Sequence, residues 1–170
     1  MADLMSRSAP RALVLRAAGT NCDLETVHAL ELAGAEVESI HVNALSRDPS
    51  ILDGVGLVAF PGGFTFGDDV ASGAVLAHII EQRLRPQLQR FVDRGGLVIG
   101  ICNGFQVLVR LGLLPGGEGR GALLWNQSGR FEDRWVYLNS GSEESPWFAP
   151  GERYFMPVAH SEGRFEWFTD

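Results

Sequence analysis

The sequence predicts an α/β fold in which a parallel sheet is flanked by helices and followed by a C-terminal antiparallel extension. Short, wholly apolar runs, typical of strands buried on both faces, recur in the first hundred residues, and helix-compatible stretches separate most of them. After about Leu114 the pattern changes to short strand-like pieces between polar turns. In parallel sheets of this kind, ligands gather at the carboxyl ends of the strands.

Four segments are expected to form the parallel sheet: 12–15, 36–42, 56–60 and 97–100. The second alternates, with Val37, Ile40 and Val42 apolar, and the other three are apolar runs. The third segment ends in the abrupt turn Pro61-Gly62-Gly63, and the fourth ends just before Cys102. Both the glycine turn and the cysteine are therefore predicted to lie at the carboxyl edge of the sheet.

Helical patterns connect these segments. The first has Val27, Leu30 and Ala33 on one face and ends at Gly34. Its expected N-terminal caps are Thr20, Asn21 or Asp23. A longer region over 74–92 has Pro86 as a kink or boundary and is broken by 93–96. The extension is expected to use strand-like pieces at 134–138, 154–158 and 164–168.

Length and composition limit the class of protein. We expect one domain over residues 11–170, preceded by a disordered tail over residues 1–10. The 14 basic and 21 acidic residues give a net charge of −7 without a basic run, which argues against a nucleic-acid partner. Two cysteines are too few for a disulfide framework, and no stretch approaches a membrane span. A cytoplasmic protein is therefore expected.

Cys102 carries the strongest chemical signal. It lies where an apolar run meets a helix-compatible stretch, and Gly100 and Gly104 flank it as in a nucleophile elbow. Small neighbours permit a tight strand-to-helix turn, and the amides at a helix N-terminus favour the nucleophilic thiolate. Most free cysteines are small buried hydrophobes. The paired glycines and the strand-to-helix setting nevertheless favour a nucleophile here.

Acyl chemistry at a thiol also needs an oxyanion hole, a substrate-binding group and a base. The amide of Asn103 and that of Gly62 or Gly63 are candidates for the oxyanion hole. Gln106 shares a helix face with Cys102 and can hydrogen-bond a polar substrate, although a surface glutamine is the simpler interpretation.

No residue is a clear base. His160 and Glu162 have the His-x-Glu spacing that can orient an imidazole, but such a tripeptide is common by chance. His41 has no partner carboxylate in its surroundings. The remaining polar and aromatic residues receive ordinary structural roles: solvated turn carboxylates for Asp68 and Asp69, helix positions for His28 and His78, and core or lid packing for Trp125, Trp135, Trp147 and Trp167.

The segment Gly100-Ile101-Cys102-Asn103-Gly104-Phe105-Gln106 resembles the nucleophile motif of class I glutamine amidotransferases. Within them, it resembles the form found in phosphoribosylformylglycinamidine synthases. Further stretches agree with that form: 19–23, 61–68, 126–128, 134–135 and 157–163. The similarity covers nearly everything from Arg11 onward. It implies a class I glutamine amidotransferase-like (flavodoxin-like) fold.

The resemblance also implies a function. Such a domain hydrolyses glutamine to glutamate and ammonia, and the ammonia passes to a formylglycinamidine ribonucleotide synthetase partner that uses ATP and magnesium in purine biosynthesis. The domain itself needs no cofactor or metal. By this resemblance Cys102 forms the glutamyl thioester, Gly63 and Asn103 supply the oxyanion amides, and Gln106 and Phe64 bind glutamine.

Two departures from the family pattern matter. The family's triad is completed by a His-x-Glu in a downstream Pro-His-Pro-Glu-like segment, which does not occur among these 170 residues. His160 and Glu162 match a separate stretch that is not the triad, and Ser161 replaces its usual glycine. The chain is therefore expected to be incomplete at the C-terminus and poorly active alone. A non-catalytic docking or regulatory subunit, and a DJ-1-like cysteine hydrolase or thiol sensor, are the alternatives.

Overall fold

A computed structural model of the chain describes residues 8–116, 120–141 and 145–168. The chain divides into two compact units, Met1–Gly121 with Trp167–Asp170, and Ala122–Glu166. Most of the predicted tail, residues 1–7, lies outside the described residues, and the single domain stays a prediction.

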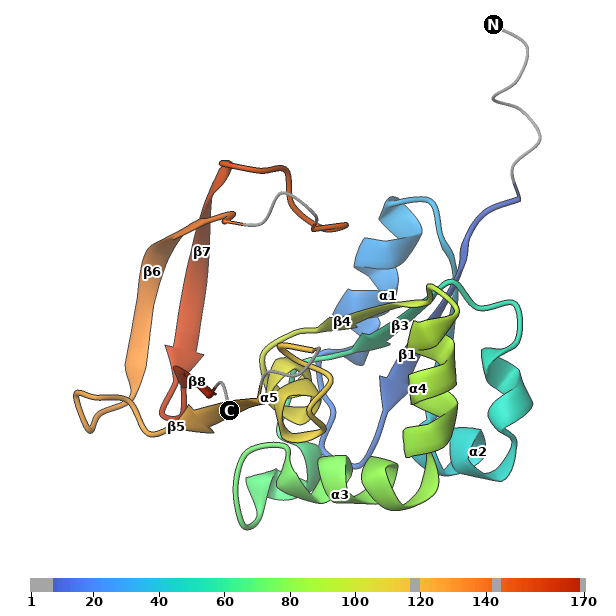
Figure 1. The fold of residues 1–170 in the computed structure, drawn as a ribbon, viewed down its shortest axis with the longest axis horizontal. Helices are drawn as coiled ribbons and strands as arrows, with labels where there is room; N and C mark the ends of the chain where they lie inside the picture. Colours follow the sequence, from blue (N-terminus) through green and yellow to red (C-terminus); the bar gives the residue numbers. More distant parts are fainter. Residues whose placement is uncertain (1–7, 117–119, 142–144, 169–170) are drawn as a thin grey trace, which may run out of the picture. The chain divides into compact units, whose positions relative to one another are not determined.

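The first unit contains a four-stranded parallel sheet in the order β2-β1-β3-β4, of which Figure 1 labels β1, β3 and β4. The strands are β1 (Arg11–Arg16), β2 (Glu36–His41), β3 (Leu57–Phe60) and β4 (Leu97–Gly100). The register pairs Val14 with Ala59 and Phe60 with Gly100. The four predicted strands and their parallel arrangement are confirmed, and β3 and β4 end side by side.

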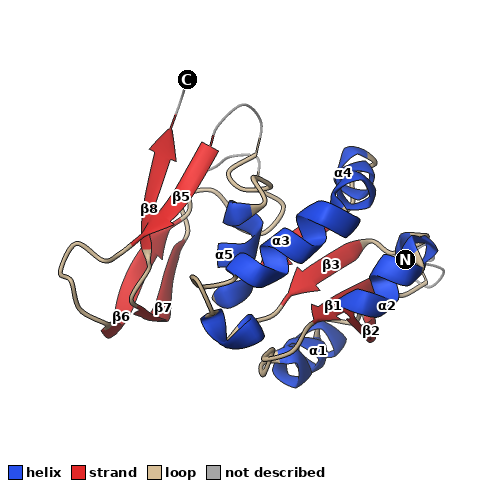
Figure 2. Ribbon diagram, turned by 90° about the horizontal axis from the view of Figure 1, so that it is seen from below, coloured by secondary structure: helices blue, strands red, loops and turns tan. Residues whose placement is uncertain are grey.

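Helices follow the strands as α1 (Asp23–Leu32), α2 (Val42–Arg47), α3 (Ala74–Arg83), α4 (Arg85–Asp93) and α5 (Asn103–Arg110), with short 3-10 turns at Pro49–Leu52 and Thr65–Asp68. Figure 2 shows α1 on the opposite side of β1 from α3. Helices therefore cover both faces of the sheet, as predicted. Within the described ranges, no helix combines the length and apolar character needed to cross a membrane.

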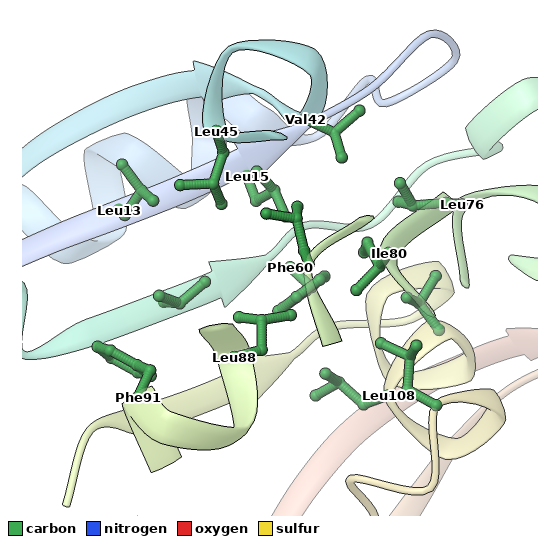
Figure 3. Packing of buried hydrophobic residues seen from close by; sticks show 14 of the residues in the cluster. Leu13, Leu15, Val42, Leu45, Phe60, Leu76, Ile80, Leu88, Phe91 and Leu108 are labelled. Atoms are coloured by element: carbon green, nitrogen blue, oxygen red, sulfur yellow. The ribbon is translucent and has the colours of Figure 1, made fainter. Parts of the chain in front are cut away.

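The core lies between one face of the sheet and helices α2 to α5 (Figure 3). Leu13, Leu15 and Phe60 of the sheet are each 1% exposed, and they pack in one cluster with fully buried Leu45 and Ile80. Alternate residues of β1 point to opposite faces, and both sets are buried, which explains why this strand reads as a continuous apolar run.

Some helix boundaries differ from the sequence predictions. None of the expected capping residues caps α1: the N-cap is Cys22, without a side-chain hydrogen bond, although Gly34 follows the helix with φ 90° as expected. The second strand ends at His41 because Val42 begins α2, and the His41 ring accepts a hydrogen bond from the Asn43 N–H at 3.1 Å.

The region 74–92 forms two helices that meet at Leu84. Pro86 lies in the first turn of α4. Proline lacks the N–H that the first turn of a helix leaves unpaired, so it begins a new helix there without the loss of an intrahelical bond. The prediction of a boundary at Pro86 is therefore confirmed.

The second unit is built from β strands. β6 (Glu132–Asn139) pairs antiparallel with β7 (Arg153–His160). The division between the units falls within β5 (Arg120–Leu124) and β8 (Arg164–Phe168), which pair with each other, and β5 is a strand that the sequence did not predict. The expected core packing is wrong for Trp125, Trp135 and Trp167, which are 67%, 60% and 55% exposed. Trp135 instead stacks on Phe155 of the neighbouring strand, with ring centroids 4.9 Å apart.

Candidate active site

Cys102 lies between the end of β4 and the start of α5 in a strained backbone conformation. Its φ of 51° and ψ of −111° place it in a region that non-glycine residues rarely occupy. Such a conformation costs about 1–3 kcal/mol and persists only where the surrounding structure holds it. The Ile101 N–H donates to the Phe60 carbonyl at 3.0 Å, so the bonding between β3 and β4 continues up to the residue before the cysteine.

The two glycines that flank Cys102 are both required by close contacts. A Cβ on Gly100 would lie 2.7 Å from the Phe105 amide nitrogen, and a Cβ on Gly104 would overlap the Phe60 carbonyl. Helix α5 thus packs directly against the ends of β3 and β4. The tight strand-to-helix turn predicted from these glycines is confirmed, and the Cys102 residue at its apex is exposed.

The Pro61-Gly62-Gly63 turn lies against Cys102. A Cβ on Gly62 would be 3.4 Å from the Cβ of Cys102 and 3.6 Å from Sγ of Cys22. Gly63 has φ 139° and forms an isolated bridge with Thr20, which fixes this turn to the segment after β1. The structure therefore brings together the two strand ends that the sequence singled out.

Two backbone amides, at the start of α5 and in the glycine turn, can donate hydrogen bonds to an oxyanion. The Asn103 N–H belongs to the first residue of α5 and has no intrahelical acceptor, and the helix dipole adds partial positive charge there. Among the described residues, no acceptor is found for the N–H of Gly63. A substrate oxygen that receives both bonds would have to lie between the glycine turn and the start of α5.

Cys22 is a second free thiol close to the first, and sequence reasoning gave it no role. Burial raises the pKa of the Cys22 thiol above its ordinary value, and the charges of Glu25, Cys102 and Asp23 raise it further. A raised pKa keeps the thiol protonated near neutral pH, and the thiol form is a poor nucleophile. Of the two cysteines, Cys102 is the candidate nucleophile because it lies exposed at the elbow, at the start of α5.

The side chain of Asn103 is buried and fully engaged. Its Oδ1 accepts hydrogen bonds from the Thr65 hydroxyl at 2.6 Å and the Thr65 N–H at 3.3 Å. Its Nδ2 donates to Asp68 Oδ1 at 2.8 Å and to Gln106 Oε1 at 3.3 Å. Asp68 also accepts from the Gly73 N–H at 3.2 Å, so its interpretation as a solvated turn carboxylate is wrong.

The two predicted glutamine-binding residues lie on either side of this network. Gln106 is half-buried on the first turn of α5, where Asn103 fixes its carbonyl oxygen. Phe64 is 63% exposed, and its N–H donates to the Gly19 carbonyl at 2.9 Å. Their contact with glutamine stays a prediction. Sequence reasoning missed Thr65, although it lies within the stretch that resembles the family.

His160 belongs to a separate hydrogen-bonded group in the second unit. Its Nδ1 lies 2.9 Å from Oδ1 of Asn126, which also accepts from the Gly163 N–H at 3.0 Å. The Asn126 Nδ2 donates to the carbonyls of His160 and Arg130. Asn126 therefore orients the imidazole and connects the segments around it, which gives His160 a structural explanation.

No group of three or more histidine, cysteine, aspartate or glutamate side chains that could hold a metal ion is found in the described ranges. The expectation that this domain carries no metal or cofactor of its own stays a prediction.

The fold and the site together define an α/β protein with a cysteine at a nucleophile elbow. The chain belongs to the family of CobB/CobQ-like glutamine amidotransferase domains, whose family model matches residues 9–170. The class I glutamine amidotransferase-like fold expected from the sequence is thereby confirmed. A glutamine amidotransferase of Thermotoga maritima, 13% identical, shares this fold with a TM-score of 0.54 over 95% of this chain and 64% of its own.

Relatives of higher sequence identity include PurQ subunits of phosphoribosylformylglycinamidine synthase. The phosphoribosylformylglycinamidine synthase subunit PurQ of Dehalococcoides mccartyi is 49% identical over 158 residues, which are 91% of this chain and 62% of the relative. PurQ of Thermotoga maritima is 38% identical over 92% of this chain and 68% of its own length. The solved PurLQS structure from Thermotoga maritima matches with a TM-score of 0.80 and 37% identity, over 96% of this chain and 72% of that one. The chain thus spans about three fifths of the length of its relatives in Dehalococcoides mccartyi and Methanococcus maripaludis.

Proposed function

We propose that Cys102 hydrolyses glutamine to glutamate and ammonia through a glutamyl thioester, and that the ammonia passes to a synthetase partner. The partner would use ATP and magnesium to make formylglycinamidine ribonucleotide in purine biosynthesis. The similarity to PurQ subunits and to a chain of PurLQS supports the choice of this reaction and this partner.

One observation carries the chemistry: the strained Cys102 at the start of α5 lies against the Gly62-Gly63 turn, and the first N–H of α5 has no acceptor among the residues that the structure describes. A cysteine placed there exposes its sulfur to a substrate carbonyl. It also has amide donors on two sides for the carbonyl oxygen.

The reaction follows from these positions. The Cys102 thiolate forms a bond to the carboxamide carbon of glutamine, and the carbonyl π electrons move to the oxygen, which accepts hydrogen bonds from Gly63 and Asn103. The carbonyl re-forms as the C–N bond breaks, and ammonia leaves with a proton from an acid. Water then attacks the thioester, the S–C bond breaks, and glutamate and the thiol are released.

The remaining roles are assigned on the same basis. Gln106 and Phe64 would hold the glutamine at the elbow and the glycine turn. The proton transfers need an acid and a base, for which the family resemblance implies a His-x-Glu pair and not His160, which is bonded to Asn126. Two free thiols accord with a reducing, cytoplasmic setting.

The two alternatives are not favoured. A docking subunit without catalysis would not require a nucleophile in a strained elbow, and a DJ-1-like protein would not be 49% identical to a PurQ subunit over most of the chain.

The test compares Cys102→Ser with Cys22→Ser in the whole protein assembled with its synthetase. Glutamine-dependent synthesis should fall on the order of 10⁴-fold or more in Cys102→Ser, because removal of a nucleophile abolishes covalent catalysis. Synthesis from added ammonia should stay unchanged. Cys22→Ser removes the neighbouring thiol and serves as the matched control, with glutamine-dependent synthesis retained.

Retained glutamine-dependent synthesis in Cys102→Ser would refute the assignment of the nucleophile. Loss of ammonia-dependent synthesis in the same variant would instead show that the substitution damages the assembly. A loss of glutamine-dependent synthesis confined to Cys22→Ser would show that Cys22, and not Cys102, is the nucleophile.

A further inference from the structure

A small group of polar side chains, two of them buried and one half-buried, joins the two halves of the candidate oxyanion hole. Asn103 is 1% exposed and Thr65 is 3% exposed, and both have hydrogen-bond partners in each other. A buried amide without partners is costly, so a core position is expected to hold an apolar residue unless the amide's hydrogen bonds are needed. We call the group formed by Thr65, Asp68 and Asn103 the polar clamp.

The polar clamp connects segments that are far apart in the sequence. Thr65 and Asp68 belong to the turn after β3, two and five residues beyond Gly63, whereas Asn103 directly follows Cys102. Each end of the clamp is therefore covalently close to one of the two amides assigned to the oxyanion hole. A shift of the turn relative to α5 would separate these amides and break the clamp.

The chemistry of the clamp requires an asparagine. The amide oxygen accepts from both donors of Thr65, while the amide nitrogen donates to the carboxylate of Asp68. Aspartate has the same shape but no donor, and leucine of similar size has neither group. The turn also needs restraint, because Phe66 and Asp68 have φ values of 55° and 54°.

We propose that the Asn103 side chain, Thr65 and Asp68 are positioning residues that hold the Gly63 amide in register with Cys102 for glutamine hydrolysis. None of the three side chains needs to touch the substrate. The clamp also orients Gln106, whose carbonyl oxygen accepts from Asn103. This proposal rests on the proposed function, and its test includes a measurement that does not depend on glutamine turnover.

Three variants separate positioning from folding. Thr65→Val removes the hydroxyl and keeps the shape, and Thr65→Ser keeps the hydroxyl. Thr26→Val is the matched control, since Thr26 is also buried at 6% exposure and donates its hydroxyl to the Cys22 carbonyl at 2.7 Å and not to a member of the clamp. Both valine variants should lose similar thermal stability.

In the whole protein with its synthetase, Thr65→Val should lower kcat for glutamine by about 10- to 10²-fold with KM little changed, because displacement of an oxyanion donor weakens transition-state binding. Thr65→Ser should restore kcat, and Thr26→Val should leave it unchanged. Equal kcat values for the two valine variants would overturn the proposal.

Asn103→Asp adds a test by pH. The introduced carboxylate faces Asp68, and two carboxylates at this distance share a proton at lower pH. A protonated carboxyl donates as the amide did. The activity of Asn103→Asp relative to the unaltered protein should therefore rise as the pH falls, and a ratio that is independent of pH would contradict the role of the donor.

Hydrogen–deuterium exchange of the peptide over residues 61–70 tests the clamp itself in the same proteins. Exchange there should be faster in Thr65→Val than in Thr26→Val. Unchanged exchange would overturn the clamp. If the unaltered protein does not hydrolyse glutamine, both the positioning role and the proposed function are overturned, even where exchange is faster in Thr65→Val. If exchange is faster in Thr65→Val but its kcat is unchanged, the positioning role alone is overturned.

Discussion

Substitution of Gly104 by alanine tests the packing that forms the elbow. The new Cβ would overlap the Phe60 carbonyl and lie 2.8 Å from the Phe60 Cβ. Phe60 ends β3 and is paired with Gly100, so its backbone is held in the sheet and does not yield as a flexible side chain would. Helix α5 must therefore move away from the sheet and take Cys102 with it.

The expected loss of stability combines two opposing effects. Alanine is favoured over glycine within a helix by about 1 kcal/mol. Overpacking against fixed core atoms costs about 1–3 kcal/mol or more, and the contact with Phe60 includes backbone, so the upper end applies. We expect a net destabilisation of about 2 kcal/mol. In a domain of this size that lowers Tm by about 4–8 °C.

Thermal denaturation followed by circular dichroism measures the shift. Gly56→Ala is the matched control, because Gly56 lies next to β3 in the same sheet and its Cβ would meet only the Arg11 carbonyl oxygen at an ordinary 3.7 Å. That variant should change Tm by no more than about 2 °C. Equal Tm values for the two variants would refute the argument that α5 packs without room for a side chain.

Three further outcomes are expected. Because the pKa of Cys22 is raised, its alkylation by iodoacetamide should reach half its maximal rate at a higher pH than in the urea-unfolded chain; an equal midpoint would contradict this. Asn126→Ala should destabilise the protein by about 1–3 kcal/mol in urea titration, since the buried amide loses its hydrogen bonds to half-buried His160 and Gly163 and to the Arg130 carbonyl, whereas exposed Asn43→Ala should cost under about 0.5 kcal/mol. Pro86→Ala should change the same free energy by less than about 1 kcal/mol, and a larger loss would show a role beyond starting α4.

Strands β1, β3 and β4 could be predicted because they are continuous apolar runs, and β2 could be predicted because its apolar residues, Val37 and Ile40, lie among polar ones as in a half-buried strand. In β1 both faces are buried, so Ala12 to Leu15 leave no polar position that suggests another structure. The elbow was predictable for a related reason. Gly100 and Gly104 are required by local contacts, and their spacing around Cys102 is visible in the sequence.

The details that were wrong or missed depend on longer-range contacts. The sequence around Asp68 predicts an ordinary turn carboxylate. Its partner Asn103 lies 35 residues away, and no local sequence pattern predicts that hydrogen bond. Helix α2 has only six residues, too few for a clear hydrophobic period, and it is capped by the ring of His41, a residue outside the usual capping set. The position of Cys22 beside the site likewise arises only because the turn after β1 meets Gly62.

Labelling of the assembled protein with a diazoketone analogue of glutamine is the most direct test of the central claim. Peptide mass spectrometry should find one equivalent of label on Cys102 and none on Cys22, and an excess of glutamine should prevent the labelling. Label on Cys22, or labelling of Cys102 that glutamine does not slow, would contradict the claim that Cys102 is the nucleophile of a glutamine site.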